Sequence, residues 1–413
     1  MTAETLFYLF VFFLVTEFAI EKYLDWLNAK HFNDDLPNEL QDIFDADAYK
    51  KAQKYNLINY KFDLLTSSLS FLIILLLLFF KAFGYLDQLV SKWTSSLFWQ
   101  SMIYLGILFL LSSLLNLPFS YYKTFVIEEK FGFNKMSKKI FWQDQLKSLV
   151  LGLFLGMLVL GAFLLFYQWT AKDFWLYAWL FLATFTIFFN MFYTSLIVPL
   201  FNKLTPLYDG ALKEKLEEMT RKTNYKLSGI YVIDGSKRSS KANAYFSGFG
   251  PKKKVVLFDT LIQDLTPDEI AAVLAHEIGH YKHKHILYNL VVSVLMTGLM
   301  LYLFSLIIDS DTLAQALGGS KAKFHLNMIA FALLFTPISF LIGLMTNWLS
   351  RKFEYQADAF AKKYHNAQDL ISALKKLSSK SLSNLTPHPW YVFANYSHPT
   401  LLQRIKALNL SKK

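Results

Sequence analysis

The stretch ILYNLVVSVLMTGLMLYLFSLII at Ile286–Ile308 contains no charged residue. A helix needs about 20 predominantly apolar residues to cross a bilayer, so this stretch is long enough to span one. The composition of the whole chain agrees with a membrane span. Of its 413 residues, 54% are hydrophobic, and its mean hydropathy is +0.30. Soluble domains intersperse apolar with polar residues, so these values indicate an integral membrane protein.

Six further apolar runs have the same character, and we expect each to form a transmembrane helix. The seven predicted spans are Leu6–Leu24, Leu64–Phe80, Phe98–Leu115, Leu149–Phe166, Phe174–Phe201, Ile286–Ile308 and Phe324–Leu349. The first is the weakest, because Glu17, Glu21 and Lys22 interrupt it, and totals of five, six or eight spans remain alternatives. Glu17 and Glu21 either face water inside the protein or reach the bilayer surface from the helix end.

Positive charge predicts the orientation of these spans. The chain has 42 Lys and Arg against 31 Asp and Glu, a formal net charge of +11. Most of the positive residues lie in segments 25–63, 117–148, 202–285 and 350–413, and the opposite side holds only Lys92, Lys172, Lys321 and Lys323. The positive-inside rule therefore places the long segments in the cytoplasm. Topology explains the basic charge, and we expect no nucleic-acid partner.

The spans divide the chain into four predicted parts. Residues 1–201 hold spans one to five with their cytoplasmic loops, and 202–285 form a cytoplasmic segment. Residues 286–349 form a membrane hairpin, and 350–413 form a helical cytoplasmic segment. The short outer loop of the hairpin forces 202–285 and 350–413 onto the same side of the membrane.

The segment 202–285 has both helical and strand patterns. Pro206–Asn224 predicts an amphipathic helix, and Gly229–Asp234, Asn243–Gly248 and Lys254–Asp259 predict strands, with Gly250 and Pro251 as a turn between the last two. A further helix begins at Thr266, which forms a capping box with Glu269. That helix runs through His285 and can continue directly into the sixth span.

This last helix carries His276-Glu277-Ile278-Gly279-His280. Residues four apart share a helix face, so both imidazoles can bind one Zn²⁺ ion, and Glu277 can activate water as a general base. The chain has no cysteine, so the remaining ligand must be another His or a carboxylate. Topology points to Glu354, just after the seventh span. One turn later, Asp358 either orients a ligand histidine or is an ordinary solvated charge.

Together these features resemble the integral-membrane CAAX prenyl endopeptidases of the type I class, a branch of the gluzincin metalloproteases. The matching stretches are IEEKFGFN at Ile127–Asn134, NAYFSG at Asn243–Gly248, VVLFDTL at Val255–Leu261, AHEIGHYK at Ala275–Lys282, SRKFEYQADAFAK at Ser350–Lys362 and YSHPTLLQRIKAL at Tyr396–Leu408. The absence of cysteine and the short N-terminus favour a bacterial member, located in the inner membrane rather than the endoplasmic reticulum.

The resemblance implies a polytopic α-helical membrane protein. About seven tilted helices surround a water-filled chamber, and a small α+β gluzincin-like protease domain with one Zn²⁺ ion lies on the cytoplasmic side. It implies that His398 stabilises the oxyanion, although a histidine before proline is also common in surface turns. It implies that Asn243 and Ala244 bind the substrate backbone, the alternative being an ordinary strand end. Arg404 either donates to the reacting diolate or pairs with Asp358.

Three functions are compatible with these residues. The family expectation is an endopeptidase for CAAX-type prenylated C-termini. The second is a quality-control endopeptidase for membrane proteins, without prenyl specificity. The third, remote alternative is a seven-helix transporter or receptor with a structural metal site, although Pro337 and Glu17 are its only support. We expect His283 and His285 to be polar residues at the membrane boundary without a role in the site. The expected partners are a peptide or prenylated peptide and the lipid bilayer; the sequence does not specify an oligomeric state.

Overall fold

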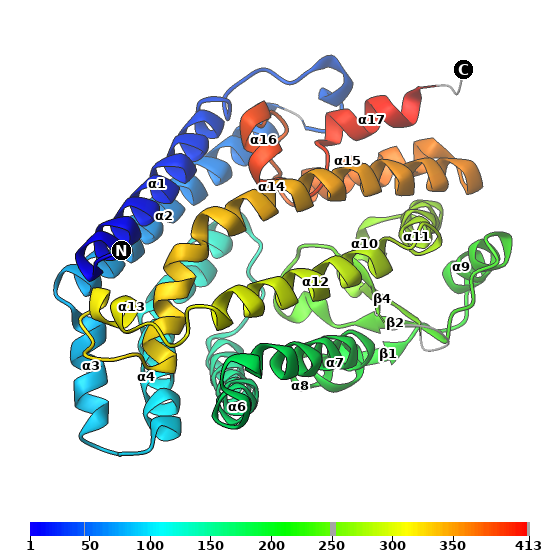
Figure 1. The fold of residues 1–413 in the computed structure, drawn as a ribbon. Coiled ribbons are helices and arrows are strands. Elements are labelled where there is room, and N and C mark those ends of the chain that lie inside the picture. The colour runs from blue at the N-terminus through cyan, green and yellow to red at the C-terminus, as the bar shows by residue number, and fades with distance from the viewer. Residues whose placement is uncertain (45, 248–252, 411–413) are drawn as a thin grey trace.

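The computed structural model describes residues 1–413 except 45, 248–252 and 411–413 (Figure 1). Six helical stretches among the described residues are long and apolar enough to cross a membrane. Their helices are α1 (Ala3–Lys30), α2 (Ala46–Phe79), α4 (Leu97–Tyr122), α6 (Lys138–Thr170), α7 (Phe174–Leu196), α12 (His285–Ser305) and α14 (Phe324–Tyr364). The stretch Lys138–Phe201 contains two of them, α6 and α7, because Ala171 adopts φ 47° between them. Each predicted span falls on one of these helices, so the predicted polytopic helical architecture is confirmed.

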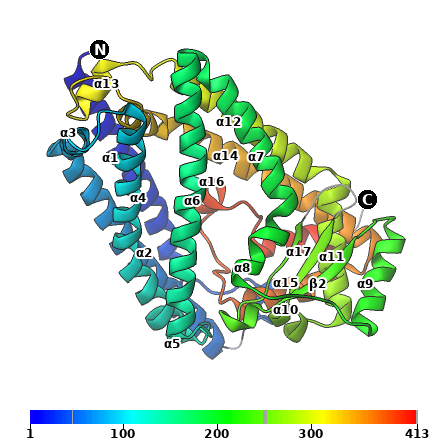
Figure 2. The ribbon, with the colours of Figure 1, turned by 90° about the horizontal axis from the view of Figure 1, so that it is seen from below.

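Few residues of the membrane helices are buried within the protein. Only 6 to 11% of the residues in the most apolar part of each helical stretch are buried. On α2 five polar residues recur three or four positions apart and therefore share one face; they are Asn56, Asn59, Asp63, Ser67 and Ser70. Figure 2 shows α1, α2 and α4 on one side and α7 and α12 on the other. Polar stripes on otherwise apolar helices agree with a water-filled interior.

Shorter helices join or flank these spans. Helix α4, which holds the third span, continues through a π-helical turn, Lys123–Glu128, into α5 (Glu129–Phe131), and α8 (Val198–Phe201) follows α7. The outer connections contain α3 (Ala82–Ser91) and α13 (Asp311–Ala316), which the sequence does not predict. Three 3₁₀ turns lie at Asn38–Leu40, Ala171–Asp173 and Gly235–Lys237.

A four-stranded sheet with order β1-β2-β4-β3 supports the cytoplasmic part. Its strands are β1 (Leu204–Pro206), β2 (Gly229–Ile233), β3 (Ala244–Ser247) and β4 (Lys254–Phe258). β2 and β4 are parallel and the two outer pairings are antiparallel, which leaves β3 as an edge strand. The predicted strands match β2, β3 and β4, whereas β1 is too short to be predicted. Gly248, Gly250 and Pro251, predicted as strand end and turn, lie outside the described residues.

Two predicted helix boundaries are wrong. The helix expected from Pro206 begins only at Ala211 (α9, Ala211–Lys222), because Pro206 belongs to β1 and Gly210 turns the chain with φ 155°. The helix with the histidines, α11 (Pro267–Lys282), follows α10 (Asp259–Asp264) and does not reach His285 or continue into the sixth span. Lys284 adopts the left-handed conformation, φ 60°, and separates α11 from α12.

The C-terminal part brings α14 against α11. Helix α14 continues beyond the predicted membrane boundary at Leu349 to Tyr364 and is followed by α15 (Ala367–Lys380), α16 (Pro389–Asn395) and α17 (Leu401–Asn409). Gly279 of α11 lies directly on α14, where an added Cβ would come within 3.0 Å of the Ala357 Cα. This close approach needs glycine, and it places the two histidines beside Glu354.

Candidate active site

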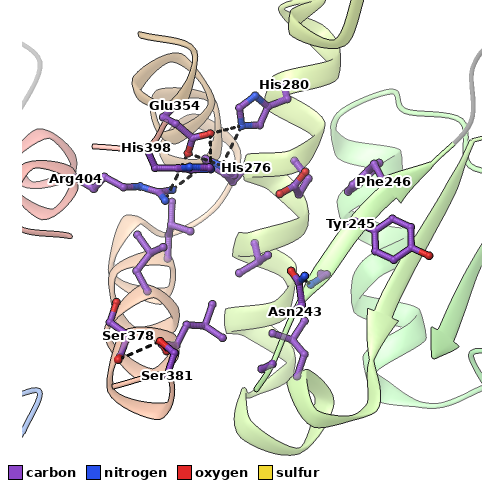
Figure 3. A pocket seen from close by; sticks show the side chains of 18 of the residues that line it. Asn243, Tyr245, Phe246, His276, His280, Glu354, Ser378, Ser381, His398 and Arg404 are labelled. Atoms are coloured by element: carbon purple, nitrogen blue, oxygen red, sulfur yellow. Dashed lines mark hydrogen bonds and ion pairs between the residues drawn. The ribbon is translucent and has the colours of Figure 1, made fainter. Parts of the chain in front are cut away.

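Three predicted ligands, His276 and His280 of α11 and Glu354 of α14, converge on one point (Figure 3). The two histidine Nε2 atoms are 3.2 Å apart. The Glu354 Oε1 atom lies 3.2 Å from Nε2 of His280, and Oε2 lies 3.4 Å from Nε2 of His276. Tetrahedral zinc with bonds of 2.0–2.1 Å holds its ligand atoms about 3.3 Å apart. The observed triangle therefore has the size of a zinc site.

The charge of Glu354 also fits a bound cation. Its carboxylate is buried, and its Oε2 has no hydrogen-bond partner among the described residues. A buried carboxylate oxygen without a partner is costly unless a cation compensates it. The donor set of two imidazoles and one carboxylate is typical of catalytic zinc sites that leave one position open. These residues fit a metal ion.

Asp358 holds His276 in position from the side opposite the ligand triangle. Its Oδ1 lies 2.8 Å from Nδ1 of His276, so the imidazole can donate there and keep Nε2 free for a metal. Burial alone would lower the pKa of His276, but the neighbouring Asp358 and Glu354 carboxylates outweigh burial and raise that pKa to about 9.

Arg404 of α17 forms a two-point ion pair with Asp358. Its Nε donates to Oδ2 at 2.9 Å and its Nη2 to Oδ1 at 2.6 Å, while Nη1 lies 3.5 Å from Oε2 of Glu354. Both side chains of the pair are buried. Two alternatives were expected for Arg404, and the structure shows the ion pair with Asp358. The arginine supports the carboxylate that orients His276.

Glu277 and His398 line the cavity that contains the triangle. Glu277 lines the central cavity, and its carboxylate has no hydrogen-bond or ion-pair partner among the described residues. The Nε2 atom of His398 lies 3.3 Å from Oε1 of Glu354, and Nδ1 is 2.9 Å from the Ser397 hydroxyl. One carboxylate and one imidazole thus line the same cavity as the three predicted ligands.

The cavity in front of these residues has a volume of about 680 Å³. One wall is the edge strand β3 with Asn243 just before it, and the opposite wall is α15 (Figure 3). Asn243 lines the cavity, and its main-chain carbonyl accepts from the Phe258 amide of β4. The outer edge of β3, including Ala244, is not paired with another described strand. An extended peptide can add to such an edge by main-chain hydrogen bonds.

Comparison with known proteins agrees with this geometry. The model described as CAAX prenyl protease N-terminal, five membrane helices, matches residues 25–203, and the model of peptidase family M48 matches residues 206–411. CAAX prenyl protease 1 of Saccharomyces cerevisiae is 36% identical over 96% of this chain and 94% of its own length. The chain belongs to peptidase family M48. The CAAX prenyl protease 1 homolog of Oryza sativa is 33% identical over 96% of this chain and 95% of its own length.

The fold of this M48 member matches a solved relative. The crystal structure of S. mikatae Ste24p superposes with a TM-score of 0.93 at 35% identity, covering 98% of this chain and 99% of the other. The resemblance drawn from the motifs is confirmed. The protein is a multi-pass membrane metalloprotease that acts on peptides, and its HExxH motif belongs to a peptidase rather than to a transporter or receptor.

His285 is part of the site, contrary to the expectation of a residue at the membrane boundary. It is buried; its Nδ1 lies 3.0 Å from Nδ1 of His280, and its Nε2 lies 2.7 Å from Oε1 of Gln356. With Gln356 as the acceptor, His285 carries its proton on Nε2 and accepts from His280 at Nδ1. This leaves Nε2 of His280 free for the metal. The sequence gives no signal for this contact, since Gln356 lies on α14.

We expect His285→Phe to weaken metal binding by about 10- to 100-fold, the usual cost of losing a hydrogen bond to a ligand. Phenylalanine keeps the ring that stacks on Phe353 at 4.0 Å but cannot accept the proton of His280. Competition with a chromophoric chelator measures the affinity. The control His283→Phe changes the exposed neighbouring histidine and should leave the affinity unaltered; equal losses in both variants would argue against the role of His285.

Proposed function

We propose that this protein is a zinc metalloendopeptidase that cleaves CAAX-type prenylated C-termini within a membrane chamber. The observation that carries the proposal is the triangle of His276, His280 and Glu354, which has the size of a zinc site and has Glu277 beside it. The prenylated substrate class is supported by the name of the yeast relative, which aligns over almost the whole chain.

The side chains suit peptide hydrolysis. Zinc, when bound, would supply a Lewis acid for the scissile carbonyl and lower the pKa of the attacking water. Glu277 accepts the proton of that water and passes it to the leaving amine. His398 donates a hydrogen bond to the oxygen that gains negative charge. Asp358 orients His276, and Arg404 holds Asp358.

Substrate binding is assigned to the edge of β3. We infer that the substrate pairs with Ala244 through the main chain and that Asn243 binds its backbone from the end of the strand. The cavity continues on the far side along α15, where the apolar Leu370, Leu374 and Leu377 line it. Residues 202–285 and 350–413 together build this protease part, whereas 1–201 and 286–349 build the chamber wall.

The protease part is assigned to the cytoplasmic side. The support is the charge asymmetry, since the segments around α9, α11 and α15 hold most of the 42 Lys and Arg residues. The bacterial source and the inner membrane, which rest on the lack of cysteine, stay predictions; the relatives named above are eukaryotic. A protease-accessibility assay on sealed vesicles tests the orientation, because α9 should be digested only from the cytoplasmic side.

Cleavage of matched peptides tests the substrate class. We expect the purified protein to cut a farnesylated CAAX peptide and to cut the same peptide without the lipid with a lower kcat/KM, as measured by mass spectrometry of the products. Equal cutting of both peptides would favour the quality-control endopeptidase over the prenyl-specific one. A protein that binds zinc and cuts neither would contradict the proposed function.

A further inference from the structure

Helices α12 and α14 touch at both ends but separate between them. At the protease end, His285 of α12 stacks on Phe353 of α14 with ring centroids 4.0 Å apart. At the outer end, Phe304 of α12 lies 5.2 Å from Phe331 of α14. The proline within α14, Pro337, removes a helix hydrogen bond and favours a bend, and α14 bends in its middle part (Figure 1). The two helices therefore frame an opening.

This opening is a cavity of about 520 Å³. Its apolar lining comes from both helices: Val292, Met296 and Met300 on α12, and Phe335, Ile342 and Leu349 on α14. Methionine and branched aliphatic side chains adapt to flexible apolar ligands. From Asn289 to Met300 the wall extends for about 16 Å at the helical rise per residue. The cavity is thus long, with apolar side chains on both of its walls.

Several polar residues of the wall add little polarity, because their hydrogens already bond to main-chain carbonyls. The Thr297 hydroxyl donates to the Ser293 carbonyl at 2.8 Å, and the Ser339 hydroxyl donates to the Thr336 carbonyl at 2.8 Å. On the protease side, the Asn347 amide donates to the Ala394 carbonyl at 2.7 Å. Hydroxyls that are satisfied along the helix do not require a polar ligand.

The cavity adjoins the catalytic cavity. Asn289 lines both of them. Ser397 also lines the cavity between the helices, and it is the residue before His398. A ligand that lies between α12 and α14 can therefore be covalently attached to a peptide that lies on β3. Its other end points along two membrane helices, toward an apolar environment.

We propose that the cavity between α12 and α14 binds the isoprenyl chain of the substrate. This inference rests on the proposed function and assigns the lipid part of the substrate to a place of its own. The peptide carries the scissile bond to His276, His280 and Glu354, while the isoprenyl chain enters the cavity and buries its surface against Met296, Met300 and their neighbours. The cavity thereby sets the preference for lipidated peptides without touching the reacting atoms.

Two substitutions that fill the cavity test this assignment. Ser293→Trp and Ser339→Trp each place a large ring on its wall, and Leu295→Trp places the same ring on an exposed position of α12 that does not line the cavity. We expect the first two to raise KM for a farnesylated peptide by about tenfold with little change in kcat. Cleavage of the unprenylated peptide by the same variants should change less than about twofold, which also shows that they are folded, and Leu295→Trp should resemble the wild type.

A farnesyl analogue with a photoreactive group gives a second readout on the unaltered protein. Crosslinks should map to α12 between Asn289 and Met300 or to α14 between Phe335 and Ser350. Crosslinks elsewhere, or equal effects of the substitutions on both peptides, as expected if bilayer lipid fills the cavity, would overturn the assignment. Cleavage of the unprenylated peptide by the wild type would then show that the peptidase itself is intact. Failure of the wild type to cut either peptide would instead reject the proposed function.

Discussion

Glu277→Gln should reduce kcat by at least about 10³-fold while the protein keeps its metal. Glutamine preserves the size and the hydrogen-bonding oxygen of the side chain but cannot accept the proton of the attacking water. Glu277 lines the catalytic cavity beside both ligand histidines, and among the described residues its carboxylate has no other partner that would explain its presence. The measurement is the steady-state rate on a peptide substrate, together with the zinc content of the same sample.

The matched control for this substitution is Asp268→Asn on the same helix, α11. Asp268 is also a carboxylate, but it forms an ion pair with Lys215 at the surface, and half of its side chain is exposed. Its loss should leave kcat within about twofold, because surface ion pairs contribute little. Activity that survives Glu277→Gln would remove Glu277 from the reaction, and loss of zinc in that variant would make it a structural residue.

Arg404→Met should destabilise the protein by about 3–5 kcal/mol and lower its activity as well. Removing one partner of a buried ion pair leaves the other charge without compensation, which costs more than the pair itself contributes. Asp358 would keep only the contact with His276, and α17 would lose its two-point attachment to α14. Thermal unfolding followed by intrinsic fluorescence, at fixed detergent and heating rate, measures the change.

Lys406→Met is the corresponding control on α17. Lys406 pairs with Glu39 at 3.2 Å, and its side chain is 58% exposed, so its loss should cost less than about 1 kcal/mol. Arg404→Lys keeps the charge but cannot reproduce the two parallel hydrogen bonds, and it should fall between the other two variants. Equal unfolding temperatures for Arg404→Met and Lys406→Met would contradict the structural role of the Arg404–Asp358 pair.

The membrane helices follow from the sequence because the bilayer imposes a length and a composition on each of them. The HExxH spacing likewise predicts two ligands on one face of α11, since the helix period fixes that geometry. Glu354 was predicted by a different argument, the short outer loop between the sixth and seventh spans. That loop returns the chain to the same side of the membrane, and the structure places Glu354 within 3.4 Å of His276.

Features that depend on contacts between distant segments could not be predicted. β1 has three residues and exists because it pairs with β2. The break before α12 depends on one residue, Lys284, in a left-handed conformation that is uncommon outside glycine and asparagine. The bond of His285 to Gln356 joins residues 71 positions apart. His285 lies five residues after His280, and α11 ends between them. Helix periodicity therefore does not predict that the two side chains meet.

Zinc removal and return tests the central claim most directly, namely that His276, His280 and Glu354 hold the metal used for peptide cleavage. The purified protein should contain one zinc per chain by elemental analysis and lose peptidase activity on removal of that zinc by a chelator. One equivalent of zinc should restore the activity of the wild type but not that of His280→Ala. Peptide cleavage by the metal-free protein, or zinc bound equally tightly by His280→Ala, would contradict the account.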